Sequence, residues 1–358
     1  MNVNVDTPVI DARGLGVTYP IRRKAWQRPL QLAAVRGVEL SIQPGETLGL
    51  VGESGSGKST TGRALLRLAP VSHGHIHLRG REITSLSQRE LRPLRRQMQM
   101  VFQDPYSSLD PSATIGDIVA EPLQVHTDLD RQARAERVRE MLAAVGLPTT
   151  AIDHYPREFS GGQRQRIAIA RAIADHPDLL VLDEAVSALD VSTQNQILEL
   201  LIELREQHGL AYLFISHNLA VVRALAHHTA VMYLGRIVES GPSARVYSSP
   251  VHPYTRALID AVPLPDPALQ RSRHKLTLIG DAPDPLDPPS GCAFRMRCPE
   301  AIDVCAVEQP VSRPVAGGGS VACHLHRPSP DVGAGPVARP GSTRAPQITE
   351  RPTSLETA

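Results

Sequence analysis

The chain has 358 residues, of which 41% are apolar, so it is long enough for one large α/β domain with an appendage or for two domains. Its 38 Lys and Arg residues nearly balance its 37 Asp and Glu residues, which excludes the strong positive charge typical of nucleic-acid-binding proteins. No apolar run approaches the roughly 18 residues of a membrane span, and the N-terminus lacks the pattern of a secretory signal, so we expect a soluble, cytosolic protein.

Short apolar runs that alternate with helical stretches predict an α/β fold between residues 8 and 240. The runs are continuously apolar rather than alternating, which is typical of strands buried on both faces of a mostly parallel sheet. The candidate strands are 46–52, 97–102, 179–183, 211–216 and 230–235.

A helical segment of about residues 104–175 separates the second candidate strand from the third. One amphipathic helix within it is expected to end at Gly146. The apolar face of that helix is formed by Val138, Met141, Leu142 and Val145. We interpret the segment as a helical insert in the α/β domain.

The composition changes after residue 241, where closely spaced prolines exclude long helices. We expect the first domain to span residues 8–260, a small C-terminal extension to span 261–326, and a disordered tail to span 327–358. The tail has few large apolar residues and many Pro, Gly, Ser and Thr, so it cannot bury enough surface to offset its chain entropy.

A glycine-rich loop follows the first candidate strand and precedes a helix, with the spacing G-x-x-x-x-G-K-S of a phosphate-binding loop. Its glycines allow backbone N–H groups to turn toward a polyphosphate, while Lys58 is expected to reach the terminal phosphates and Ser59 to ligate Mg²⁺. The alternative, a Gly/Ser-rich turn, is disfavoured by the flanking strand and helix. The candidate nucleotide-binding residues here are Gly52, Ser54, Gly55, Ser56, Gly57, Lys58, Ser59 and Thr60.

Two acidic residues at the end of the third candidate strand complement this loop. We expect Asp183 to orient the water shell of the metal and Glu184 to polarise the attacking water. By themselves they would be interpreted as helix-capping acids after a core strand. Together with the loop they predict a site that hydrolyses a nucleoside triphosphate.

A second candidate anion site lies at the start of a predicted helix. Ser160 is a good N-cap residue, and Gly161 and Gly162 expose backbone donors there. The alternative is an ordinary capped helix, but two adjacent glycines destabilise a helix without a packing gain. We therefore expect something to approach this backbone closely.

The segment FSGGQ, between the phosphate-binding loop and the acidic strand, resembles the signature of ATP-binding-cassette (ABC) ATPases. VFQDP resembles the Q-loop of that family, SALD its D-loop and ISHN its switch-histidine segment, and the resemblance covers roughly residues 8–325. It implies a P-loop ABC ATPase cassette of the α/β class, with a mixed sheet core, a helical subdomain and a small C-terminal extension. The further site residues that it implies are Tyr19 against adenine, Gln103, Gln163, Asp190 and His217.

The resemblance also implies a mechanism. In the family, two cassettes face each other head to tail, and the signature helix of one caps the ATP bound to the other. Glu184 would be the general base, His217 would contact the γ-phosphate and the attacking water, and Gln103 would touch Mg²⁺ and link the site to a transmembrane partner. Ala185 and Asn218 depart from the Pro and Asp usual in the subfamily, but neither change removes a reacting group.

Residues 249–263 resemble the start of the C-terminal extension in ATP-binding subunits of dipeptide, oligopeptide, glutathione and nickel importers. This implies an ATPase at the cytoplasmic face of the inner membrane that powers peptide uptake. Its partners would be a second cassette, identical or paralogous, two permease subunits and an extracytoplasmic solute-binding protein, with no nucleic acid. The alternatives are a nickel importer cassette, an exporter cassette, and a soluble cassette ATPase acting on ribosomes or DNA.

Four cysteines lie in the last quarter of the chain, and no others occur: Cys292, Cys298, Cys305 and Cys323. A disulfide is disfavoured in the cytosol, which keeps thiols reduced. Four clustered thiolates suit a 4Fe-4S cluster, and the spacing lacks the C-x-x-C knuckle usual at structural zinc. The pattern also resembles family members that hold such a cluster. We expect a structural 4Fe-4S cluster, with zinc or unmetallated thiols as alternatives.

Overall fold

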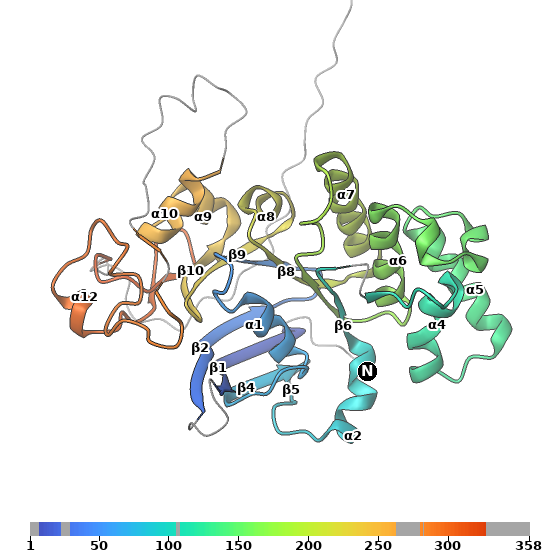
Figure 1. Ribbon diagram of the computed structural model, residues 1–358, viewed down its shortest axis with the longest axis horizontal. Coiled ribbons are helices and arrows are strands. Elements are labelled where there is room, and N and C mark those ends of the chain that lie inside the picture. The colour runs from blue at the N-terminus through green and yellow to red at the C-terminus, as the bar shows by residue number, and fades with distance from the viewer. Residues whose placement is uncertain (1–6, 23–28, 105–107, 263–279, 282, 327–358) are drawn as a thin grey trace, which may run out of the picture. The chain divides into compact units, whose positions relative to one another are not determined.

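Two β-sheets and the helices around them make up the described part of the chain (Figure 1). The computed structural model describes residues 7–22, 29–104, 108–262, 280–281 and 283–326, so the tail predicted over 327–358 lies outside them. The smaller sheet is antiparallel, with strand order β2-β1-β4-β5. Its strands are β1 Ile10–Ile21, β2 Leu30–Ile42, β4 His73–Leu78 and β5 Arg81–Glu82.

The larger sheet has the strand order β11-β12-β10-β9-β3-β8-β7-β6. Its central strands, from β9 to β6, are parallel, and β10, β11 and β12 pair antiparallel with their neighbours. Its strands are β3 Thr47–Val51, β6 Met98–Val101, β7 Leu179–Asp183, β8 Ala211–Ser216, β9 His228–Tyr233, β10 Arg236–Pro242, β11 Arg313–Pro314 and β12 Ser320–Val321. The five predicted strands match the parallel ones, and the expected mixed sheet is confirmed.

Alternate residues of the parallel strands face two separate hydrophobic cores. On β8, Tyr212 and Phe214 belong to one core, whereas Leu213 and Ile215 belong to the other, which also contains residues of the smaller sheet. Every residue of β8 is buried. Burial on both faces is the physical reason that these strands read as uninterrupted apolar runs.

Helices cover both faces of the larger sheet. Helix α1 contacts strands of both sheets, and α4, α5 and α6 pack together beside β6 (Figure 1). The longer helices are α1 Lys58–Leu65, α4 Ile115–His126, α5 Arg131–Ala144, α6 Gly161–Ile173, α7 Val191–His208, α8 Leu219–Leu225 and α10 Pro253–Asp260. The shorter ones are α2 Gln88–Leu91, α9 Ser243–Ser248, α12 Val304–Val307 and the 3₁₀ turns Arg92–Gln97, Thr149–Asp153 and Pro156–Glu158.

The amphipathic helix predicted in the insert is α5. Its residues Val138, Met141 and Leu142 are buried, and the chain leaves the helix through Gly146 at a φ of 71°. The smaller sheet, in contrast, was not among the predicted strands. The β1–β2 pairing carries three register irregularities, which break the regular alternation that a surface strand would show.

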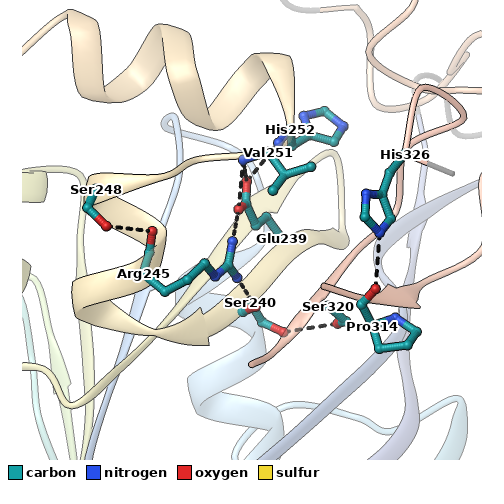
Figure 2. A network of polar contacts seen from close by, with 9 residues as sticks. All are labelled: Glu239, Ser240, Arg245, Ser248, Val251, His252, Pro314, Ser320 and His326. Atoms are coloured by element: carbon teal, nitrogen blue, oxygen red, sulfur yellow. Dashed lines mark hydrogen bonds and ion pairs between the residues drawn. The ribbon is translucent and has the colours of Figure 1, made fainter. Parts of the chain in front are cut away.

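The C-terminal extension adds β11 and β12 to the larger sheet next to β10. Close to that junction, the fully buried carboxylate of Glu239 pairs with Arg245 of α9 and accepts hydrogen bonds from the N–H groups of Val251 and His252, at 3.0 Å and 2.9 Å (Figure 2). The described residues belong to one compact unit. The boundary placed between residues 260 and 261 therefore stays a prediction.

Candidate functional site

A cleft of about 640 Å³ opens where the parallel strands end. A predicted site residue follows each of four parallel strands within two positions. These residues are Gly52 after β3, Gln103 after β6, Glu184 after β7 and His217 after β8. Parallel strands end at a common edge, and this brings the four segments together. The cleft is lined by Tyr19, Leu32, Ala34, Ser54, Gly55, Gly57, Lys58, Ser59, Thr60, Gln103, Glu184 and His217.

The phosphate-binding loop turns sharply between β3 and α1, and two of its glycines are sterically required. Gly57 has a φ of 105°, and a Cβ atom added there would lie 2.3 Å from the carbonyl oxygen of Ala34. Gly52 has a φ of 154°, and its added Cβ would lie 2.2 Å from the carbonyl oxygen of Met232. Only glycine combines this backbone conformation with such close approach.

Lys58 is almost fully buried beneath the loop, with 4% of its surface exposed. Its ammonium group donates to the carbonyl oxygens of Gly52 and Glu53, at 2.9 Å and 2.8 Å. Burial lowers the pKa of Lys58, although the carboxylates of Glu184, Asp183 and Glu53 act in the opposite direction. A buried cation at the base of a glycine-rich loop is suited to bind polyphosphate oxygens.

The two predicted metal-binding side chains on α1 and β7 are in direct contact. The hydroxyl of Ser59 donates to Oδ1 of Asp183 at 2.7 Å. Burial raises the pKa of the Asp183 carboxyl group, while the bond from Ser59 and the guanidinium of Arg63, 3.9 Å away, lower it. Hard oxygen donors from a hydroxyl and a carboxylate are what Mg²⁺ prefers, so the chemistry of this pair fits the ion.

Three predicted catalytic residues meet at the carboxylate of Glu184. The side-chain amide of Gln103 donates to its Oε2 at 2.9 Å, and Nδ1 of His217 lies 3.3 Å from its Oε1. Glu184 has a φ of 48°, which is uncommon for a residue with a side chain, and its N–H donates to the carbonyl oxygen of Ile215 on β8 at 2.9 Å. The backbone of Glu184 is thus held in a strained conformation at the mouth of the cleft.

The predicted signature segment lies outside the cleft. Ser160 caps α6, with its hydroxyl accepting from the N–H of Gln163 at 3.3 Å and its own N–H donating to the Gln163 side chain at 2.9 Å. A Cβ added to Gly162 would lie 2.4 Å from Cγ2 of Thr193. The expectation that these glycines bring no packing gain is therefore wrong for Gly162, because the start of α7 packs against it.

Asp190 also lies outside the cleft, at the N-terminus of α7. Its carboxylate accepts from the N–H of Thr193 at 3.0 Å and from the Thr193 hydroxyl at 2.7 Å. These two bonds lower the pKa of Asp190, the backbone bond most. Because the same Thr193 contacts Gly162, the N-terminus of α7 lies against the N-terminus of α6.

The four cysteines do not support the expected iron–sulfur cluster. All four are free thiols; Cys305 is buried and the other three are half-buried. Burial raises the pKa of Cys292 and Cys323, and that of Cys298 to about 11, with further increases from neighbouring cysteines. Among residues that the structure describes, no group of three or more His, Cys, Asp or Glu side chains is arranged to hold a metal ion. The structure therefore lends no support to the expected cluster, or to zinc, at these cysteines.

Sequence reasoning missed two residues that line the cleft, Leu32 and Ala34 of β2. Both are ordinary apolar residues in a strand of the smaller sheet, and no local pattern marks them. Their place in the site depends on how that sheet packs over the phosphate-binding loop.

In the described ranges, no helix is long and apolar enough to span a bilayer.

The sequence matches the pattern of the ABC transporter family over residues 35–187 and that of the oligopeptide/dipeptide transporter C-terminal region over residues 238–305. It is 51% identical over 321 residues to a probable peptide ABC transporter ATP-binding protein of Sinorhizobium fredii, covering 89% of this chain and 90% of that protein. It is 50% identical to the oligopeptide transport ATP-binding protein OppF of Escherichia coli, over 80% of this chain and 86% of the relative.

Among solved structures, the fold resembles an ATP-binding cassette determined as a dimer in a post-hydrolysis state with ADP and Pi. The TM-score is 0.59 at 28% identity, and the match covers 65% of this chain and 98% of the other. A second match, at a TM-score of 0.59 and 26% identity, is a cassette of a Clostridium perfringens ABC transporter complex, over 68% of this chain and 92% of that one.

Proposed function

Since the chain belongs to the ATP-binding subunits of ABC transporters, in the oligopeptide and dipeptide branch, we propose that it hydrolyses ATP to power the uptake of peptides across a membrane. Its relatives carry names of peptide import and oligopeptide transport proteins, and its C-terminal segment matches the pattern of that branch. The observation that carries the catalytic part of the proposal is the carboxylate of Glu184 between Gln103 and His217, at the end of the phosphate-binding cleft.

In the proposed reaction, the N–H groups of residues 54–60 and the ammonium of Lys58 bind the phosphates, and Tyr19 stacks on the adenine. Ser59, Asp183 and Gln103 would hold Mg²⁺, and the ion would supply positive charge that offsets the negative charge of the phosphates. Glu184 takes a proton from the attacking water as that water's oxygen forms a bond to the γ-phosphorus and ADP leaves. Gln103 and His217 keep the carboxylate oriented toward that water.

The proposed site is composite. The accessible N-terminus of α6 lies outside the cleft of its own chain and contains Ser160, Gly161, Gly162 and Gln163. There it would bind the phosphates of a nucleotide held by a second cassette. The proposed partners are that second cassette, two permease subunits and an extracytoplasmic solute-binding protein. The chain would then be a peripheral subunit at the cytoplasmic face of the inner membrane.

Replacement of the proposed base tests the catalytic part. Glu184→Gln keeps a side chain that can bond to Gln103 and His217 but cannot accept a proton, so we expect hydrolysis to fall at least about 100-fold while ATP binding persists. Phosphate release and nucleotide titration measure the two effects. The matched control is Glu199→Gln on α7, outside the cleft. Unchanged turnover in Glu184→Gln would remove Glu184 as the base.

Transport is tested with the assembled importer in proteoliposomes. We expect ATP-dependent uptake of labelled di- and oligopeptides, lost in the Glu184→Gln assembly. Uptake of Ni²⁺ in place of peptides would assign the chain to the nickel branch. ATPase activity that responds to ribosomes or DNA, and not to the permease, would overturn the proposal of transport.

A further inference from the structure

The loop residue Glu53 is held through all three of its polar groups. Its N–H donates to the phenol oxygen of Tyr254 at 3.0 Å, and its carbonyl oxygen accepts from Lys58 at 2.8 Å. Its carboxylate accepts two hydrogen bonds from Arg297, at 2.8 Å and 3.1 Å. Two of these three partners, Tyr254 and Arg297, come from the C-terminal part of the chain, more than 200 positions away.

The side chain of Arg297 that binds Glu53 is largely buried. Only 9% of its side chain is exposed, against 29% for Glu53. Its guanidinium lies 6.0 Å from the centre of the Tyr233 ring. The ring of Phe294, three residues earlier in the extension, packs 5.3 Å from Tyr233 and 5.4 Å from Tyr254, centre to centre. The guanidinium that binds the loop is therefore supported by a packed cluster of aromatic rings.

The charge of Arg297 also matters to an anion in the cleft. The carboxylate of Glu53 lies between Gly52 and Ser54 in the phosphate-binding loop, close enough to act electrostatically on Lys58. A bidentate guanidinium neutralises that carboxylate and fixes its orientation. Without it, a free carboxylate in the loop would repel the phosphates and compete for the ammonium of Lys58.

We propose that Arg297 is a positioning residue for the nucleotide: it holds Glu53, and through Glu53 the phosphate-binding loop, so that ATP affinity depends on how the C-terminal extension is docked. This inference rests on the proposed function, because it concerns ATP binding at the same loop. It gives the extension a role at the ATP site that needs no metal at the cysteines.

A double-mutant cycle tests the proposal in the full-length chain, with Mg²⁺ and a fluorescent ATP analogue. We expect Arg297→Gln to raise the Kd for the nucleotide about tenfold, which corresponds to about 1.4 kcal/mol. Glu53→Gln alone is also expected to raise the Kd, and the Glu53→Gln/Arg297→Gln double variant is expected to lose no more affinity than Arg297→Gln, because both substitutions break the same contact. In ATPase assays, KM should follow the Kd while kcat changes less than about threefold.

The matched control is Arg256→Gln. Arg256 also ties the extension to the cassette, through Glu300 at 2.9 Å, but does not touch the loop. We expect its nucleotide Kd to equal that of the wild type. Circular dichroism and thermal unfolding verify that each variant is folded, and Arg297→Lys, which keeps the charge but not the fork, replaces Arg297→Gln if the latter does not fold.

Each outcome has one meaning. If the wild-type chain and Arg256→Gln bind ATP and the Arg297 variant binds it equally well, the inference is overturned and the proposed function stands. If the losses of Glu53→Gln and Arg297→Gln add in the double variant, Arg297 acts on ATP binding independently of Glu53, and the positioning role is overturned. If the wild-type chain itself does not bind ATP, the proposed function has failed.

Discussion

At the residue scale, the phosphate-binding loop shows how little freedom the site leaves its glycines. Gly57 and Gly55 both have positive φ values, of 105° and 77°, but only Gly57 has a backbone oxygen where a Cβ atom would be. A side chain at either position costs about 1–2 kcal/mol in backbone strain. At Gly57 the collision with the carbonyl of Ala34 adds to that cost and must displace the loop or β2.

These two glycines give a matched pair of variants. We expect Gly57→Ala to raise the Kd for ATP more than tenfold, because the displaced loop misdirects its N–H groups. Gly55→Ala, with no heavy atom of the described chain within 4 Å of its added Cβ, is expected to lose about 1–2 kcal/mol of stability and to bind ATP more tightly than Gly57→Ala. Nucleotide titration and chemical denaturation measure both effects, and equal losses of affinity would contradict the steric argument.

At the element scale, α6 and α2 begin with the same capping arrangement. Ser160 and Gln163 cap α6, and Ser87 and Glu90 cap α2, each through reciprocal side-chain and backbone hydrogen bonds. Only the first of these helix N-termini belongs to the proposed signature. The contribution of the α6 cap to stability can therefore be separated experimentally from the proposed function of the α6 N-terminus.

We expect Ser160→Ala and Ser87→Ala to lower the free energy of unfolding by a similar amount, about 1 kcal/mol, because each removes one cap. Only Ser160→Ala should reduce ATP hydrolysis by the assembled transporter, because only its hydroxyl would face the nucleotide of the partner cassette. Urea unfolding and phosphate release provide the two measurements. Hydrolysis that is equal in the two variants would count against the signature role.

Helix α10 begins with a buried histidine, His252, whose Nδ1 accepts from the N–H of Tyr254 at 3.0 Å. Burial, and then the nearby Arg256, lower its pKa to about 3. Between pH 3 and about pH 6.5, His252 is protonated in the unfolded chain but not in the folded chain. The free energy of unfolding is therefore retained above about pH 6.5 and decreases as the pH falls below it. The expected contribution of His252 is about 1.4 kcal/mol per pH unit.

The variant His252→Asn keeps a capping acceptor without a titrating group. We expect its free energy of unfolding to fall less steeply than that of the wild type between pH 7 and pH 5. Denaturant unfolding at the two pH values measures the difference. Parallel slopes for the two proteins would show that His252 does not carry this pH dependence.

At the scale of the whole molecule, the buried network around Glu239 joins β10, α9 and the start of α10 beside the strands of the extension (Figure 2). Glu239→Gln leaves the guanidinium of Arg245 without its buried counter-charge. We expect a loss of about 3–5 kcal/mol in the free energy of unfolding. Glu300→Gln, which breaks the exposed pair with Arg256, should cost less than about 1 kcal/mol. Similar losses in chemical denaturation would contradict this ranking.

The sequence by itself determined the parallel strands and the position of each chemical group along the chain. Strands buried on both faces must be continuously apolar, and a loop that wraps phosphates must have glycines at set positions, so both leave local patterns. The loop that begins at Gly52 and the acidic residue Glu184 could therefore be assigned to one nucleotide site from the sequence, whereas Gln103 and His217 were added by the resemblance. The resemblance of the ordered motifs to ABC ATPases supplied their expected roles.

Only the tertiary structure decided which distant residues touch the site. Leu32, Ala34 and Arg297 reach the phosphate-binding loop through sheet packing and through an extension far away in sequence, and such contacts leave no periodic signal. The same is true of the cysteines, whose clustering in sequence did not produce a metal-binding arrangement in the described residues. Local patterns report backbone and burial requirements, whereas the meeting of remote side chains depends on the packing of the whole fold.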